Sequence, residues 1–332
     1  MPYTRNVDIK PCQHHDWGMS IRSEALTDRG DDADASRVSC VEVDGARPRF
    51  AERAALGAES LTWGRFGDYR TALLIGWAGT LQVMHPVISA ALVEHSDFLE
   101  NPMNRLARSA IPITRAVYEG PVTGRAIRDE HVNIKGRYTA NGDVSADGVR
   151  YHALNPEPFF WAHATFFMMQ IAPAGIFTAP LTAEEKEQLY QESRTWYTQY
   201  GMSLRGTPET FEDFMQYWDN TIETVLTRTE LIDRAAPFYA GHPGPPPYPQ
   251  VPRWLWKIIG APSSRLGLWV CRALLPEAAR GALGWTWTKS DQRRFDVFAF
   301  AVRGVFSVLP RWVRLSWIAR RGYRQARRGA LA

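Results

Sequence analysis

The sequence predicts an all-α protein, a single helical globule of roughly ten helices. Apolar residues recur at helical spacing through most of the chain after residue 68, and segments with the alternating pattern of β-strands are nearly absent. The one break in the helical pattern lies near residues 136–152, where Asn-Gly and Asp-Gly pairs predict a loop or a short hairpin.

The chain divides into four parts by composition. Residues 1–60 predict an N-terminal arm that is partly irregular, because Gly, Asp, Arg and Ser are frequent from Arg29 to Arg47 and no periodic pattern emerges. Residues 61–240 carry the main helical domain. A proline-rich connector at 241–253 leads to the C-terminal helices of residues 254–332, which are apolar enough to pack on the same globule and end in an arginine-rich segment.

Proline and glycine set the expected helix ends in the first half. Two glycines and an aspartate in residues 63–68 predict a turn before the first long helix. The predicted helices then follow at 68–85, 87–98, 103–119 and 123–135.

The second half begins with the most apolar helix, predicted at 159–177 and disturbed at Pro173. Thr182 with Glu185 three residues later matches a capping box and predicts the start of an amphipathic helix at 183–200. Further helices are predicted at 211–228, 254–259, 265–274, 291–309 and 311–328.

The composition excludes several classes of protein. Three widely spaced cysteines give no disulfide framework and indicate a reducing compartment. The chain has no ExxH pair, HExxH, paired CxxC, GxGxxG, GxxxxGK[ST] or GxSxG, so di-iron bundles, zinc peptidases, nucleotide enzymes and α/β-hydrolases are disfavoured. The absence of CxxCH excludes a covalent c-type haem.

Two segments bear on contact with a membrane. Residues 71–93 contain no Lys, Arg, Asp or Glu, but Gln82, His85 and Pro86 interrupt them, which favours a buried helix pair over a membrane span. From Arg303 onward the chain has eight arginines and no acidic residue, without a nucleic-acid motif. We expect a solvated helix face and a cytoplasmic protein, with peripheral contact to a membrane or an acidic partner as the alternative.

His163 lies in the most apolar stretch of the chain, FFWAHATFFMMQ at residues 159–170. Aromatic residues, Phe160 and Phe167 among them, lie one helical turn before and after it. A histidine in such surroundings needs a built-in partner. Two interpretations remain open: a core histidine bonded to a backbone carbonyl, or an axial ligand to a large flat cofactor such as haem.

Arg105, Arg108 and Ser109 share one helix face. The two cations repel unless an anion lies between them, and a haem propionate is one such anion. Salt bridges to Glu100, Glu119 or a similar carboxylate are the alternative.

His131 lies on a second cationic face, between Arg128 and Lys135. It could orient a propionate or act in proton transfer, or it could be a surface histidine. No carboxylate stands out as a general base, and Glu130 is considered for that role only because it lies beside His131.

Five motifs follow one another along the chain: Q-x-x-HP, EHSDF, R-x-x-R-S, H-V-N-I-K-G and W-A-H-A-T. In this order they resemble the MpaB-type oxygenase family, whose catalytic domain is shared with the latex-clearing rubber oxygenases. The resemblance covers about Trp63 to Phe238. The last two motifs are fairly specific as a pair.

The resemblance implies helices that enclose a pocket for non-covalent haem b (iron protoporphyrin IX). It assigns His163 as the metal ligand, with Arg105, Arg108, His131, Phe160 and Phe167 around the cofactor. Arg108 and His131 are the expected catalytic residues. Arg108 and Ser109 stand where the rubber oxygenases have Lys and Thr. Because an arginine stays protonated, we expect an open sixth position or a ligand from elsewhere.

The expected activity is that of a haem b-dependent oxygenase acting with O2 on an apolar, isoprenoid-like or other hydrophobic small molecule. Two alternatives remain at this stage. One is a peroxide-driven haem oxidase or peroxidase. The other is a non-enzymatic helical protein that binds haem or lipid at a membrane surface through its C-terminal arginines. None of these functions involves nucleic acid.

Overall fold

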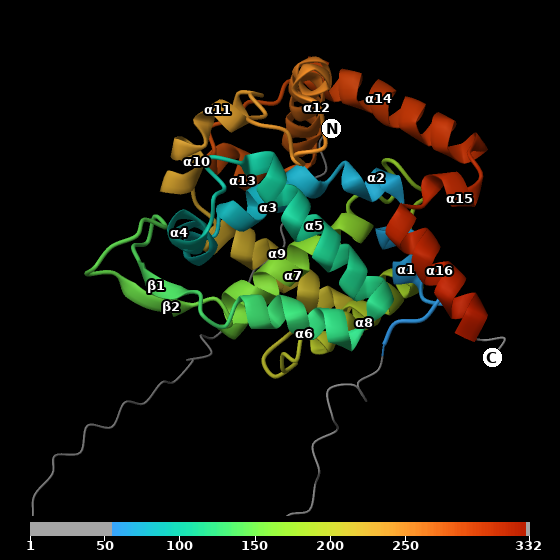
Figure 1. Ribbon diagram of the computed structural model, residues 1–332, viewed down its shortest axis with the longest axis horizontal. Coiled ribbons are helices and arrows are strands. Elements are labelled where there is room, and N and C mark those ends of the chain that lie inside the picture. Colours follow the sequence, from blue (N-terminus) through green and yellow to red (C-terminus); the bar gives the residue numbers. More distant parts are fainter. Residues whose placement is uncertain (1–54, 330–332) are drawn as a thin grey trace, which may run out of the picture. The chain divides into compact units, whose positions relative to one another are not determined.

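The computed structural model describes residues 55–329, which belong to one compact unit (Figure 1). Apart from its last six residues, the predicted N-terminal arm lies outside the described part of the chain. Helices dominate the described residues, and one two-stranded sheet accompanies them. The prediction of an all-α fold is therefore confirmed.

The first elements of the described residues are α1 (Leu61–Phe66), α2 (Tyr69–Ala72), α3 (Ile75–Val83) and α4 (Pro86–His95). The predicted turn at 63–68 and the single helix at 68–85 were therefore wrong. The side chain of Ser60 accepts a hydrogen bond from the Trp63 amide and caps the start of α1. The helix then continues through Gly64. The Asp68 side chain accepts a hydrogen bond from the Arg70 amide and so caps the start of α2. This cap separates α2 from α1.

Two further helices lead to the sheet. They are α5 (Pro102–Glu119) and α6 (Pro121–Glu130), and Gly120 links them with φ at 74°. The predicted extension of α6 to residue 135 was wrong, because its last turn closes at His131 and the chain turns into β1 (Lys135–Tyr138). This strand pairs antiparallel with β2 (Val149–His152), so the predicted short hairpin is confirmed.

Helix α7 (Pro156–Ile171) runs through the middle of the other helices (Figure 1). It packs against α1, α3 and α8 (Ala183–Gln199). Trp161, Ala164 and Phe167 are completely buried, as expected for a helix that is apolar on most sides. It ends at Ile171, two residues before Pro173, and does not continue to residue 177 as predicted.

Capping boxes fix the starts of the next helices. Thr182 and Glu185 bond each other's backbone at the start of α8, as predicted. Thr210 and Asp213 do the same at the start of α9 (Phe211–Thr224). The short helices α10 (Glu230–Arg234) and α11 (Ala236–Tyr239), which sequence reasoning did not predict, follow it.

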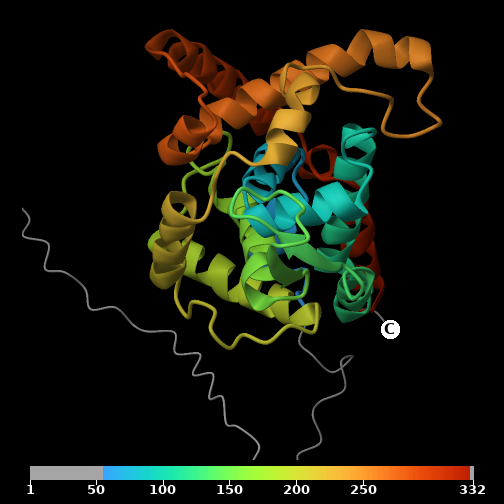
Figure 2. The same ribbon diagram turned by 90° about the vertical axis from the view of Figure 1, so that its left-hand side faces the viewer.

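The C-terminal helices are α12 (Arg253–Leu274), α13 (Glu277–Ala282), α14 (Lys289–Val308), α15 (Arg311–Arg314) and α16 (Trp317–Gly329). Helix α12 packs along α3 and lies across the earlier helices (Figure 2). It continues through Pro262, where two separate helices were predicted. The predicted helix at 311–328 is instead broken at Leu315, which pairs with Asp68 in an isolated bridge, while the Ser316 amide bonds the Gly67 carbonyl at 2.8 Å.

Within residues 55–329, no single helix is both long and apolar enough to cross a membrane. Length and composition alone would allow one bent pair, Tyr69–Val83 with Pro86–His95, whose two halves meet at 99°. Much of α3 in this pair is buried in the core, including Trp77, Ala78 and Leu81.

Candidate functional site

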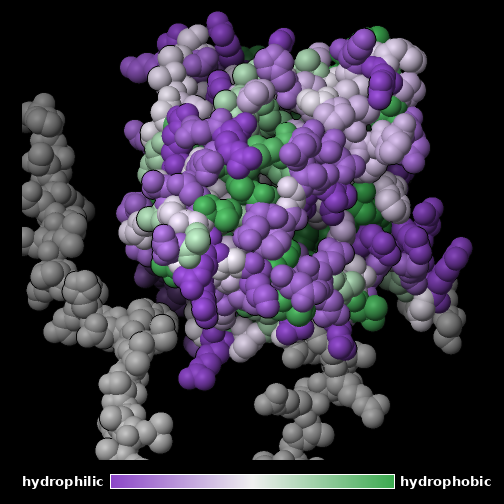
Figure 3. Space-filling view, turned by 60° about the vertical axis from the view of Figure 1, so that its left-hand side comes forward, coloured by the Kyte–Doolittle hydropathy of each residue, from purple (hydrophilic) through white to green (hydrophobic). Residues whose placement is uncertain are grey.

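A largely apolar cavity of about 220 Å3 lies between α3, α4, α5 and α7. The end of α6 and the residue after it close another side, through Glu130 and His131. On the face that carries α4 and the hairpin, apolar residues gather in the middle of an otherwise polar surface (Figure 3). A space of this kind suits an apolar ligand held by a few polar groups.

His163 reaches this cavity from α7 and is only 3 % exposed. Its Nε2 lies 3.1 Å from the Ser193 carbonyl oxygen and 2.9 Å from the Ser193 hydroxyl on α8. Its Nδ1 is buried and has no hydrogen-bond partner among the described residues. Burial lowers the pKa of His163 to about 3, so the ring is neutral near pH 7.

The Ser193 contact fixes the tautomer of this ring. A carbonyl oxygen only accepts, so Nε2 carries the proton and donates it. Nδ1 of a neutral ring then holds a free lone pair. A second group bonded to the far nitrogen, which orients the ring and makes it a stronger ligand, is typical of metal-binding histidines.

The aromatic residues of α7 divide between two faces. Phe159, Ala162, His163 and Phe166 are spaced at i, i+3, i+4 and i+7, and all four line the cavity.

The two phenylalanines predicted to contact the cofactor lie elsewhere on α7. Phe160 packs edge-on against Tyr197 at 5.3 Å, and Phe167 packs against Phe214 at 5.0 Å, both outside the cavity lining. The helical spacing in the sequence could have predicted that Phe160 and Phe167 lie on a different face of α7 from Phe159 and Phe166.

Arg105 and Arg108 both line the cavity, but their environments differ. Arg105 donates to the Ser96 hydroxyl at 3.1 Å and to the Ser109 hydroxyl, and no carboxylate of residues 55–329 lies within 4.0 Å of it. Burial lowers its pKa, with the neighbouring Arg108 as the next cause, yet an arginine remains protonated. Arg105 therefore forms no salt bridge with residues 55–329, although Asp97 and Glu130 raise its pKa from a longer distance.

Arg108 is more exposed and forms a salt bridge with Asp97. The alternative interpretation of a structural salt bridge thus describes Arg108, although its partner is neither Glu100 nor Glu119.

His131 sits just after α6 with its ring at the cavity wall. Its Nδ1 donates to the Ile127 carbonyl at 2.7 Å, and its ring packs edge-on against Phe159 at 6.0 Å. The bond to a carbonyl leaves Nε2 as the acceptor of a neutral ring. His95 also reaches the cavity, but its Nε2 is bonded to the Lys135 carbonyl at 3.1 Å.

Sequence reasoning missed two glycines and a tyrosine in the cavity wall. Gly76 and Gly79 lie one turn apart on α3, so this part of the wall is bare backbone. A Cβ on Gly79 would come within 3.2 Å of Leu106. Tyr200 lines the cavity with its hydroxyl buried, near the Trp196 indole but without a hydrogen bond of good geometry. The GWAG sequence was the available signal for the glycines.

These donors fit a haem better than a bare metal ion. Among the described residues, no three His, Cys, Asp or Glu side chains come together as a metal site. A haem brings four ligand nitrogens of its own and needs from the protein one axial donor, which the Nδ1 lone pair of His163 could provide. Arg105 offers a cation for a propionate, and Gly76 and Gly79 add no side chain of their own to the α3 wall of the cavity.

The family model of the "ER-bound oxygenase mpaB/B'/Rubber oxygenase, catalytic domain" matches residues 63–304. The chain belongs to this family. The match passes Phe238, where the resemblance of the motifs ended, and reaches into α14. As a member of the mpaB/rubber oxygenase family, the protein is an oxygenase and hence an oxidoreductase. This membership does not support the alternative of a non-enzymatic binding protein.

All residues that line the cavity fall inside the part that matches the mpaB/rubber oxygenase model. No curated protein and no solved structure matches the chain.

Proposed function

We propose that the protein is a haem b-dependent oxygenase that acts on an apolar small molecule, with His163 as the axial ligand. The observation that carries this proposal is the state of His163: the ring is buried and neutral, its Nε2 is held by Ser193, and its unprotonated Nδ1 has no hydrogen-bond partner among residues 55–329. An unpartnered polar atom in a core is costly, and coordination to iron would remove that cost.

Three features of the cavity would hold the cofactor. His163 provides the nitrogen ligand, Arg105 a cation for a propionate, and the Gly76/Gly79 face of α3 a flat wall. The space of about 220 Å3 is smaller than the roughly 300–1,000 Å3 usual for ligand pockets. Binding therefore requires side chains at the edge to move, and the exposed Arg108 is one that can do so.

Haem, when bound, supplies the redox chemistry that activates O2. The chain's own residues then decide what enters and how polar groups are placed. The cavity is apolar because its lining includes Val83, Val87, Ile88 and Phe166. An apolar lining favours a hydrocarbon substrate and excludes water. Tyr200 keeps its proton, because burial raises its pKa well above the ordinary value, and can donate a hydrogen bond.

The proposed catalytic groups are Arg108 as a hydrogen-bond donor and His131 as a proton acceptor at Nε2. Both lie in the wall of the cavity, but Arg108 would have to leave Asp97 to act there. We place proton transfer at His131, because its free nitrogen needs no such rearrangement.

The proposal is tested by the absorption spectrum and haem content of the protein produced with a haem supply. We expect a Soret band in the wild type, loss of most bound haem in His163→Ala, and retention in His95→Ala, whose ring is bonded to a carbonyl at the cavity edge. Added imidazole should restore the band in His163→Ala, because it can occupy the space that the ring leaves. A wild type without haem, or full haem in His163→Ala, would contradict the proposal.

A further inference from the structure

A second cavity, of about 570 Å3, shares no lining residue with the first. It lies between the α1–α2 segment, the turn after α7, and α14 with α15. We call it the arginine pocket, because five of its lining residues are Arg65, Arg70, Arg303, Arg311 and Arg314. The proposed oxygenase chemistry uses none of them.

Carboxylates balance the charges of the arginine pocket only in part, and Glu185 and Asp68 act on Arg65 from beyond salt-bridge distance. Asp68 is the one acidic residue in its lining, and both of its oxygens bind Arg70, at 2.8 and 2.7 Å. The other four arginines have no carboxylate of residues 55–329 within 4.0 Å. Cations gathered in this way repel each other unless an anion lies among them.

The remaining arginines are held by neutral groups. Arg65 donates to the Gln170 carbonyl at 3.3 Å and to the Thr178 hydroxyl at 3.1 Å, and Arg303 donates to the Gly175 carbonyl at 2.9 Å. Neutral acceptors fix the orientation of a guanidinium but leave its charge unpaired.

The third and fourth of these arginines come from α15. Arg311 donates to the Tyr323 hydroxyl at 2.7 Å. The Nε of Arg314 is buried and has no hydrogen-bond partner among the described residues. Both therefore keep donors for a ligand.

Gln170 is a second, independent sign of a ligand. It belongs to the wall of the arginine pocket and is completely buried, yet neither its Nε2 nor its Oε1 has a hydrogen-bond partner within residues 55–329. Leaving a buried amide unpaired is unfavourable, because the amide has lost its hydrogen bonds to water without gaining others. A ligand with several acceptor oxygens would bind the guanidinium groups that line the space, and it would reach the amide nitrogen after a small movement of the wall.

We propose that the arginine pocket binds a phosphoryl group. Its compact set of acceptor oxygens and its charge match several guanidinium donors, which bind phosphate in pairs of hydrogen bonds. Two sources share this chemistry: a phosphate compound free in solution and the head group of an anionic lipid.

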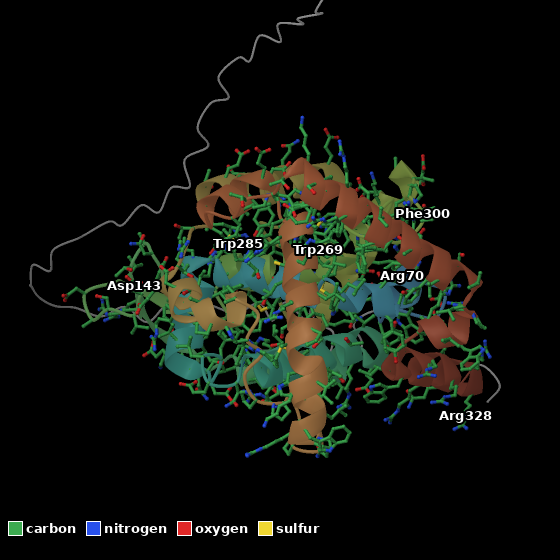
Figure 4. All side chains as sticks on the ribbon, turned by 90° about the horizontal axis from the view of Figure 1, so that it is seen from above. Arg70, Asp143, Trp269, Trp285, Phe300 and Arg328 are labelled. Carbon is green, nitrogen blue, oxygen red and sulfur yellow. The ribbon has the colours of Figure 1, made fainter. Side chains whose placement is uncertain are left out.

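The rim of the pocket bears on the second source. Val308 and Trp312, at the ends of α14 and α15 beside the arginines, are 80 and 65 % exposed. Figure 4 shows Arg70 on α2 beside α14, and Phe300 on the outer side of α14. Apolar side chains next to a phosphoryl site are where the acyl chains of a lipid would lie.

The first experiment measures the Tm of the full chain with inorganic phosphate and with chloride at the same ionic strength. We expect phosphate to raise Tm, because a ligand that binds only the folded state stabilises it. In Arg303→Gln/Arg314→Gln, phosphate should bind roughly tenfold more weakly or worse. The matched control, Arg327→Gln/Arg328→Gln on α16, removes the same charge outside the pocket and should respond like the wild type.

The second experiment is co-sedimentation with vesicles of equimolar phosphatidylcholine and phosphatidic acid, compared with phosphatidylcholine alone. Binding that depends on Arg303 and Arg314 identifies a lipid head group, whereas a Tm response to inorganic phosphate without vesicle binding identifies a soluble ligand. No response to either probe overturns the proposal. Equal losses in the pocket and α16 variants also overturn it, since they would show general surface charge.

Gln170→Glu provides a test that keeps the arginines in place. The new carboxylate has nearly the same shape and puts a negative charge in the wall of the arginine pocket, where it should repel a phosphoryl group. We expect this variant to fold, as judged by circular dichroism, and to lose the rise in Tm with phosphate. A folded variant with an unchanged phosphate response would contradict the placement of the site.

Discussion

At the scale of single residues, the decisive contact is between His163 on α7 and Ser193 on α8. The Ser193 carbonyl fixes the proton on Nε2, and the hydroxyl of the same residue adds a second partner at 2.9 Å. We predict that Ser193→Ala, which keeps the carbonyl, binds haem roughly tenfold more weakly, as is usual when a group that orients a ligand is removed. Haem titration and the rate of haem transfer to apomyoglobin measure this change.

Thr195→Ala is the matched control for the Ser193 prediction. Its hydroxyl bonds the Gln191 carbonyl within α8, two residues along the same helix and away from His163. It should leave the affinity for haem unchanged. An equal effect of both variants would show that α8 was disturbed as a whole.

The sequence alone could identify His163 but not the state of its ring. A single histidine among phenylalanines and methionines is visible in the letters. Ser193, thirty residues away, is not, because the contact is made only when α7 and α8 pack together. Arg105 and Arg108 share a helix face in the sequence, and only the fold shows that Asp97 forms its salt bridge with Arg108 and not with Arg105.

At the scale of elements, helix starts were easier to predict than helix ends. The capping box of Thr182 and Glu185 is a local pattern, and the structure contains both of its hydrogen bonds. By contrast, α1 forms across Gly64 and α12 continues through Pro262 because packing of their apolar faces outweighs local preference. Rules about glycine and proline therefore placed false breaks at both positions.

The same capping box gives a prediction about stability. Thr182→Ala removes the side-chain acceptor for the Glu185 amide and should lower the free energy of unfolding by about 1 kcal/mol. For a chain of this size, Tm should fall by about 2 °C. Scanning calorimetry measures the shift. Thr224→Ala serves as the comparison, because its exposed hydroxyl bonds only the Asn220 carbonyl within α9, and a fall as large as that of Thr182→Ala would refute the capping argument.

At the scale of the whole molecule, the proline-rich connector does not separate a second domain. Trp77 on α3 donates its indole N–H to the Leu274 carbonyl on α12 at 3.1 Å, and Cys271 on α12 lies against Thr80. The C-terminal helices therefore complete the core that begins at α3. They also form one side of the arginine pocket, so the extension contributes both packing and a site.

The buried histidine also predicts how the stability of the haem-free protein depends on pH. Burial lowers the pKa of His163 from an ordinary 6.5 to about 3. Below pH 6.5 His163 is protonated in the unfolded chain, whereas in the folded chain it stays neutral down to about pH 3. Acid therefore favours unfolding. The contribution of His163 to the free energy of unfolding is therefore fully present above pH 6.5. Between pH 6.5 and about pH 3 it declines by about 1.4 kcal/mol for each pH unit.

We therefore predict that wild-type protein without haem loses stability more steeply than His163→Leu between pH 6.5 and pH 4, because leucine has no proton to gain. Urea unfolding at a series of pH values gives both slopes, and carboxylates common to the two proteins cancel in their difference. Parallel curves for wild type and His163→Leu would mean that the His163 ring accepts a proton in the folded state as readily as in the unfolded state. A proton would then compete with iron for the ring nitrogen.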